Sequence, residues 1–161
     1  MTLTTLRLSK SGQTVALRDQ GAGAPLFLIH GVGMQSAAWG PQIDAFSKTH
    51  RVIAVDMPGH GGSSPLAVGC DLREFVAWCH DVVQTLDVGP VNIAGHSMGA
   101  LIAGGFAVEH PELTTRVCLI NGVYLRDAPA RAAVVNRADR IKAGEIDLET
   151  PLSRWFGDSA T

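Results

Sequence analysis

Short, continuous apolar runs alternate along the chain with longer segments in which apolar residues recur every three or four positions. The continuous runs occupy 26–29, 52–55, 91–94 and 117–120. The periodic segments occupy 36–48, 72–86 and 98–110. A continuous run of four apolar residues is typical of a parallel strand buried on both faces, and helical spacing predicts a helix with one buried face. The pattern therefore predicts an α/β fold, with a mostly parallel, doubly wound sheet covered by helices on both faces.

The two ends of the chain depart from this alternation. At the amino-terminal end, two short alternating segments flank Ser11-Gly12, and they predict an antiparallel β-hairpin formed by 6–8 and 15–17. Beyond Asn121 the apolar runs stop, and 130–142 has the composition of a helix that carries basic residues. The sequence thus predicts a core over residues 1–125 and a separate helical segment that begins in 126–161.

The composition fits a single compact domain and excludes several classes of partner. Of the 161 residues, 46% are hydrophobic and 17% are charged, and the formal net charge is −2. The basic residues are scattered, so nothing predicts binding to nucleic acid or to an anionic membrane surface. The first residues lack the features of a secretory signal, and no run approaches the roughly 20 apolar residues of a membrane span. We expect a soluble, cytoplasmic protein with no nucleic-acid or membrane partner.

The cysteine pattern gives no sign of a disulfide framework or of a zinc site. Cys70, Cys79 and Cys118 are an odd number, and they form no C-x-x-C pair. Cys79 lies on the apolar face of a predicted helix and Cys118 in a predicted buried strand, where a thiol packs as a small hydrophobic group. We expect reduced cysteines without a catalytic role, and no metal site.

A pentapeptide in the middle of the chain carries the strongest chemical signal. Residues 95–99 read Gly-His-Ser-Met-Gly, the pattern G-x-S-x-G, and stand between a predicted strand and a predicted helix. A serine hydroxyl is a weak nucleophile unless it is exposed beside a base, and a sharp strand-to-helix turn exposes it. The same turn directs the first N–H groups of the helix toward a developing oxyanion. This context predicts acyl transfer at Ser97; the alternative is a serine that only caps the helix.

Two further glycine-bearing loops follow the first two parallel strands. Residues 30–33 read His-Gly-Val-Gly, and residues 56–63 read Asp-Met-Pro-Gly-His-Gly-Gly-Ser. A dinucleotide site would use the first loop together with Asp56, but Ser36 stands where that site needs its third glycine. That alternative also leaves the pentapeptide unexplained. We expect Asp56 to brace its own loop.

These three loops, in this order and at these spacings, resemble those of the α/β-hydrolase family, over about residues 3–125. The resemblance implies that Ser97 is the nucleophile and that the backbone N–H groups of Val32 and Met98 form the oxyanion hole. It implies no metal and no organic cofactor, and it makes 126–161 the beginning of a helical cap. The loop-shaping residues on the substrate side would be His30, Gly31, Gly33 and His96.

The activity implied by the resemblance is hydrolysis of a small-molecule carboxylic ester or lactone through an acyl-enzyme on Ser97. Carbon–carbon bond hydrolysis and perhydrolysis are alternatives on the same fold. A hydrolase-like module that binds without catalysis is the alternative of another class.

The histidine and the acid of a catalytic triad are not evident after Ser97, although they follow the nucleophile in such hydrolases. His110 is the one histidine after it, and thirteen residues along a helix place it roughly 20 Å away. We therefore expect the acid, the histidine and the last strands of the sheet to lie in a longer parent protein or in a companion chain that completes the fold. This chain alone is then expected to be nearly inactive.

Overall fold

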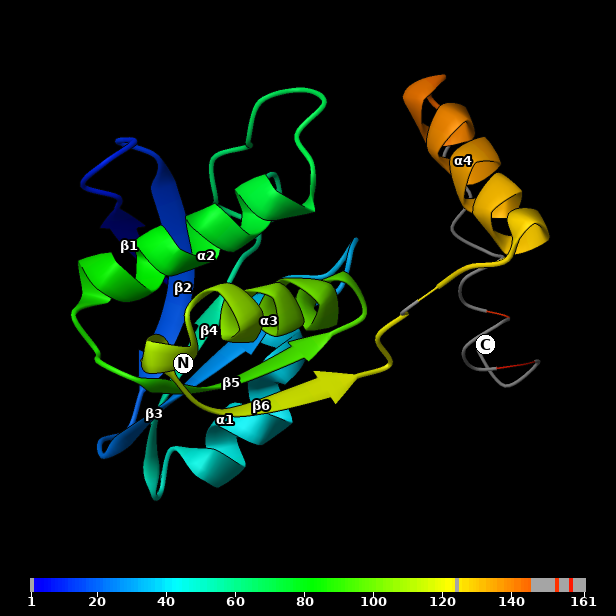
Figure 1. The fold of residues 1–161 in the computed structure, drawn as a ribbon. Helices are drawn as coiled ribbons and strands as arrows, with labels where there is room; N and C mark the ends of the chain where they lie inside the picture. The colour runs from blue at the N-terminus through cyan, green and yellow to red at the C-terminus, as the bar shows by residue number, and fades with distance from the viewer. Residues whose placement is uncertain (1, 124, 146–152, 154–156, 158–161) are drawn as a thin grey trace. The chain divides into compact units, whose positions relative to one another are not determined.

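The computed structural model describes residues 2–123, 125–145, 153 and 157. Contacts divide the chain into two compact units, 1–123 and 124–161. The larger unit holds a six-stranded sheet with three α-helices, and the smaller unit holds the helix α4 (Ala128–Lys142) (Figure 1). The unit boundary lies two residues before the predicted end of the core at residue 125. Most of the predicted cap beyond residue 145 lies outside the described residues.

The order of the elements is the one that the hydrophobic pattern predicts. The strands are β1 (Thr4–Arg7), β2 (Thr14–Gln20), β3 (Ala24–Ile29), β4 (His50–Val55), β5 (Val91–His96) and β6 (Thr114–Ile120). The helices of the larger unit are the 3-10 helix η1 (Ser36–Trp39), α1 (Gly40–Phe46), α2 (Leu72–Leu86), α3 (Met98–Glu109) and the 3-10 helix η2 (Pro111–Leu113).

The sheet has the strand order β1-β2-β4-β3-β5-β6, which confirms the predicted fold class. The first two strands form the predicted antiparallel hairpin, and β2 pairs antiparallel with β4. From β4 onward every pair is parallel, with Leu26 opposite Val52 on one side and opposite Asn92 on the other. The strands that carry the three glycine-bearing loops therefore end at the same edge of the sheet, where a site can form.

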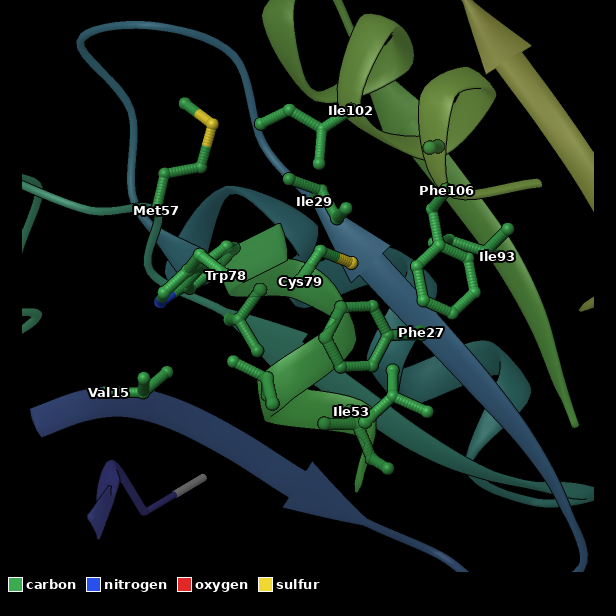
Figure 2. Close-up of a cluster of buried hydrophobic side chains, with 14 of the residues drawn as sticks. Val15, Phe27, Ile29, Ile53, Met57, Trp78, Cys79, Ile93, Ile102 and Phe106 are labelled. Atoms are coloured by element: carbon green, nitrogen blue, oxygen red, sulfur yellow. The ribbon is translucent and has the colours of Figure 1, made fainter. Parts of the chain in front are cut away.

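Alternate residues of the central strands enter two separate hydrophobic cores. In β3, Phe27 and Ile29 join the larger core, which is covered by α2 and α3, whereas Leu28 joins the smaller core on the other face. Figure 2 shows the larger core, where Phe27 of β3 lies between Ile53 of β4 and Phe106 of α3. The smaller core consists of Leu28, Trp39, Ile43, Val52, Ala54 and Ala94. Burial on both faces explains why the central residues of these strands, such as 26–29 and 52–55, are apolar at consecutive positions.

The helix α2 has the best-defined ends. The Asp71 side chain accepts a hydrogen bond from the backbone N–H of Arg73, at 2.8 Å, and Glu74 accepts one from the N–H of Asp71, at 2.7 Å, in a capping box. Its carboxyl end is closed by Asp87 in the left-handed conformation. On the buried face, burial raises the pKa of the Cys79 thiol, so this cysteine stays protonated and packs as a hydrophobic group, as predicted.

Two features of packing depart from the hydrophobic pattern alone. The run at 117–120 has the pattern of a buried strand, but with the last strands of the sheet expected elsewhere it becomes an uncovered apolar edge. Accordingly Cys118 is exposed and Leu119 is 55% exposed, and among the described residues only β5 pairs with β6. The predicted helix 36–48 is a 3-10 helix followed by α1, with Pro41 in the first turn of α1, a position that proline favours. Phe46, expected on the buried face, is 46% exposed.

Candidate active site

Ser97 forms the turn between β5 and α3. The strand ends at His96 and the helix begins at Met98, so the turn consists of one residue. Ser97 has φ 55° and ψ −114°, a conformation that residues with a side chain rarely adopt and that costs on the order of 1–3 kcal/mol. The surrounding structure must therefore hold Ser97 in place, and it leaves the residue half-buried at the edge of the sheet.

Two glycines make this turn possible because separate backbone segments lie too close together there to leave room for a side chain. A Cβ on Gly95 would collide with the carbonyl of Gly99 and lie 2.6 Å from the N atom of Ala100. A Cβ on Gly99 would collide with the carbonyl oxygen of Ile29 and lie 2.6 Å from that of His30. Both glycines of the G-x-S-x-G pattern are thus required by backbone contact, and Gly99 fixes the start of α3 against the end of β3.

The loop after β3 lies directly against the serine turn. A Cβ on Gly31 would be 2.9 Å from Nδ1 of His96 and 3.2 Å from Cβ of Ser97, so the absence of a side chain lets the two loops touch. Within the described part of the chain, no hydrogen bond engages the backbone N–H of Val32 or of Met98. The N–H of Gly33, by contrast, donates to Nε2 of His60 at 3.1 Å. Of these loop donors, Val32 and Met98 therefore have the N–H groups that a ligand could use.

His30 ties this loop to the neighbouring one from inside the protein. Its side chain is fully buried, Nδ1 lies 2.7 Å from the carbonyl oxygen of Gly31, and Nε2 accepts the N–H of Met57 at 2.9 Å. An acceptor Nε2 and a donor Nδ1 define a neutral imidazole with its proton on Nδ1. Burial lowers the pKa of His30, and the nearby His60 lowers it further, while the hydrogen bond to Gly31 and the charge of Asp56 oppose this shift.

The neutral His30 makes stability depend on pH. The unfolded chain takes up a proton near the ordinary pKa of 6.5, whereas folded His30 does so only at lower pH. The stabilisation is therefore complete above pH 6.5 and is lost as pH falls from 6.5 toward the folded pKa, with a slope of up to about 1.4 kcal/mol per pH unit. We expect His30→Gln to remove this part of the slope, as measured by urea unfolding at a series of pH values.

The matched control for that prediction is His50→Gln, in a half-buried histidine of β4 away from the loops. This variant makes the same change of residue type without touching the loops around Ser97. An unchanged slope in His30→Gln, or an equal loss of slope in both variants, would contradict the assignment.

Asp56 and His60 hold the second loop, as expected for Asp56. The Asp56 carboxylate is buried and accepts the backbone N–H of Ser36 at 2.6 Å and that of Gly62 at 3.1 Å. Nδ1 of His60 lies 3.1 Å from the carbonyl oxygen of Pro58. Because Asp56 is fully engaged with backbone donors, it serves as a brace between the second loop and η1.

A cavity of about 260 Å³ opens beside the serine turn. Its wall contains His30, Met34, Trp39, Gln42, His96 and Ile120. From the sequence, His30 and His96 were expected in this region, but Trp39 and Gln42 were not. Their three-residue spacing in the predicted helix that follows the first glycine loop could have indicated a shared surface.

His110, the one histidine that follows Ser97 in the sequence, lies away from the serine turn. His110 is at the far end of α3 from Ser97, where its ring stacks on that of His80 with the centroids 4.2 Å apart. Across the described ranges, no three His, Cys, Asp or Glu side chains come together to hold a metal ion. None of the helices in those ranges combines the length and the apolar character needed to cross a membrane.

Comparison with known proteins gives a family and several relatives. A family profile described as "alpha/beta hydrolase fold" matches residues 24–144. A curated relative from Acinetobacter baylyi, named (E)-2-((N-methylformamido)methylene)succinate hydrolase, is 54% identical over 155 residues. That match covers 96% of this chain and 59% of the relative, so the chain spans less than two thirds of its relative's length.

Solved structures with the same fold include enzymes of two named types. The enol-lactonase from Burkholderia xenovorans has a TM-score of 0.80 and 25% identity, over 88% of this chain and 55% of that one. A meta-cleavage product hydrolase from Pseudomonas fluorescens has a TM-score of 0.71 and 28% identity, over 78% of this chain and 47% of that one.

Proposed function

The chain belongs to the α/β-hydrolase family, and from that membership we propose that the whole protein hydrolyses a carboxylic ester or lactone through an acyl-enzyme on Ser97. The observation that carries the proposal is the serine turn itself. Ser97 is held at φ 55° between β5 and α3, by glycines that admit no side chain. A strained serine persists where its exposure has a use, and nucleophilic attack is the use that this turn serves.

In the proposed reaction the Ser97 oxygen attacks the carbonyl carbon and loses its proton to a base. The tetrahedral oxyanion accepts hydrogen bonds from the N–H groups of Val32 and Met98, which are not engaged within the described residues. Its collapse breaks the bond to the leaving alcohol, which takes up the proton, and water then hydrolyses the acyl-enzyme in the same two stages. No described histidine is hydrogen-bonded to Ser97, so the proposal places the base elsewhere in the whole protein.

A second candidate differs in the bond that is hydrolysed. The relative that is 54% identical is named for a succinate that bears an N-methylformamido group, so its substrate combines two carboxylates with an amide. The second candidate is therefore hydrolysis of a small dicarboxylate with an amide group, by the same attack from Ser97. The meta-cleavage product hydrolase keeps carbon–carbon bond hydrolysis as a further possibility of the fold.

The test is covalent labelling of the whole protein with a fluorophosphonate, together with hydrolysis of 4-nitrophenyl acetate. We expect one label per molecule, carried on the peptide that contains Ser97, and loss of the esterase activity in proportion to labelling. Parallel assays with a lactone and with an N-formyl amide of a dicarboxylic acid would then separate the two candidates. A protein that takes no label and turns over none of these compounds would instead be a non-catalytic binding module.

A further inference from the structure

The loop that carries the N–H of Val32 is a tight turn. The N–H of Met34 donates to the carbonyl oxygen of Gly31 at 3.2 Å, which closes a β-turn of four residues. Gly33 has φ 79°, whereas the φ of Val32 is not positive, and this combination defines a type II turn. A type I turn keeps the same closing hydrogen bond but points the central peptide to the opposite side, and glycine adopts both forms. The closing bond alone therefore does not fix the peptide between Val32 and Gly33.

His30 fixes the first peptide of this turn from inside the protein. Its Nδ1–H donates to the carbonyl oxygen of Gly31 at 2.7 Å. The carbonyl and the N–H of one trans peptide point in opposite directions, so the N–H of Val32 points away from the buried ring of His30. Ser97 lies close by, since a Cβ on Gly31 would be 3.2 Å from the Cβ of Ser97. The peptide that carries the Val32 donor is thus held next to the nucleophile.

His60 fixes the second peptide of the turn from the neighbouring loop. Its Nε2 accepts the N–H of Gly33 at 3.1 Å, and its Nδ1 lies 3.1 Å from the carbonyl oxygen of Pro58. The ring is therefore neutral, with its proton on Nδ1. A ring that also carried a proton on Nε2 would point one N–H group at another and would lose the bond to Gly33. Within the described residues no other group accepts the N–H of Gly33.

We propose that His60 is a positioning residue for the oxyanion donor Val32. By holding the N–H of Gly33, it selects the one form of the turn in which the peptides on both sides of Val32 are fixed. Its half-buried ring lies edge-on to that of His30, with the centroids 5.2 Å apart, so the two histidines support each other. The proposal rests on the proposed function, because the role it assigns is in stabilising the oxyanion formed at Ser97.

Two substitutions at His60 each keep one nitrogen position of the ring. Glutamine places its amide oxygen near the position of Nε2 and keeps an acceptor for Gly33. Asparagine places its amide nitrogen near the position of Nδ1 and keeps only the donor to Pro58. Each variant loses one hydrogen bond, so we expect similar stability for the two in urea unfolding. The difference in activity between them then reports the bond to Gly33.

We expect His60→Asn to lower kcat for 4-nitrophenyl acetate about tenfold or more, with KM within about twofold, and His60→Gln to keep kcat within about threefold of the parent protein. Loss of an oxyanion donor costs about a hundredfold or more, and a donor that is misplaced for part of the time costs less. KM should stay because these donors act on the transition state and not on the bound ester. His50→Asn, in β4 away from the loops, should change neither constant.

A spectroscopic readout tests the hold on the turn without relying on catalysis. In the whole protein with isotope-labelled glycine, the amide resonance of Gly33, assigned by its absence in Gly33→Ala, should move as pH falls from about 8 to about 5, the range in which histidines titrate. The same resonance should stay in place in His60→Gln. The other titratable groups that face His60 in the described part of the chain are His30 and Asp56, and the variant retains both.

The outcomes separate the positioning role from the hydrolase function. A His60→Asn protein with the kcat of the parent, or equal losses of kcat in His60→Asn and His60→Gln, would overturn the positioning role and leave the hydrolase function in place. A Gly33 resonance that does not respond to pH would overturn it as well. A Gly33 resonance that follows the protonation of His60, in a protein that hydrolyses no ester, would support the hold on the turn and reject the proposed function.

Discussion

Replacing Ser97 with alanine is expected to lower kcat for ester hydrolysis by at least about four orders of magnitude, with no comparable loss of stability. The Ser97 oxygen is the attacking atom of the proposed reaction, and removing a catalytic serine leaves only the catalysis provided by binding and by the oxyanion donors. The measurement is the hydrolysis of 4-nitrophenyl acetate by the whole protein, with fluorophosphonate labelling as a second readout that should disappear.

Two further variants separate a catalytic serine from a structural one. Ser11→Ala, in the exposed turn between β1 and β2, should keep full activity and labelling. Ser97→Gly should be as inactive as Ser97→Ala but more stable by about 1 kcal/mol, because glycine adopts φ 55° without strain. A Ser97→Ala protein that retains a tenth of the parent kcat would rule out the acyl-enzyme on this residue.

Replacing Gly99 with alanine is expected to lower the free energy of unfolding by about 3 kcal/mol or more. A Cβ at this position would collide with the carbonyl oxygens of Ile29 and His30, and both are backbone atoms that cannot rotate away. The start of α3 would have to move away from β3, which would also displace Ser97. Urea unfolding of the whole protein measures the loss.

The control lies in the same helix. A Cβ on Gly104 would meet only a side-chain carbon of Leu119, at 3.7 Å, which is an ordinary contact. Since alanine favours the helix over glycine, Gly104→Ala should stabilise the protein by up to about 1 kcal/mol. Equal effects at Gly99 and Gly104 would show that helix propensity, and not backbone contact, decides the outcome.

The parallel strands could be predicted from the sequence because their residues report burial on both faces. The run at 26–29 is apolar at every position, since Phe27 and Ile29 enter one core and Leu28 the other. The serine turn could also be predicted, because a strand-to-helix turn of one residue demands the glycines that flank it in the sequence. In both cases the residues that the fold requires, apolar ones in the strands and glycines in the turn, are adjacent in the sequence and can be recognised there.

Features that depend on distant partners could not be predicted in this way. The run at 117–120 by itself indicates a buried strand, and the exposure of Cys118 follows from the pairing of β6, which among the described residues is with β5 alone; the expectation of an uncovered edge came from the missing last strands and not from the run. Likewise, Trp39 and Gln42 join the cavity only because η1 and α1 pack against β4, near the edge of the sheet where the glycine-bearing loops begin. The left-handed backbone of Ser97 is a property of the assembled turn, since serine alone does not favour it.

The strand order of the sheet also has a consequence for synthesis on the ribosome. β3 lies between β4 and β5, and Leu26 pairs with Asn92, sixty-six positions further along the chain. At about 5–20 residues per second, one edge of β3 waits roughly 3–13 s for its partner. During that interval β4 and then α2 are synthesised, but Phe27 and its apolar neighbours still lack β5 on one side of β3 and α3 above them. One edge of the apolar strand β3 therefore stays without its partner strand until residue 96 has been synthesised.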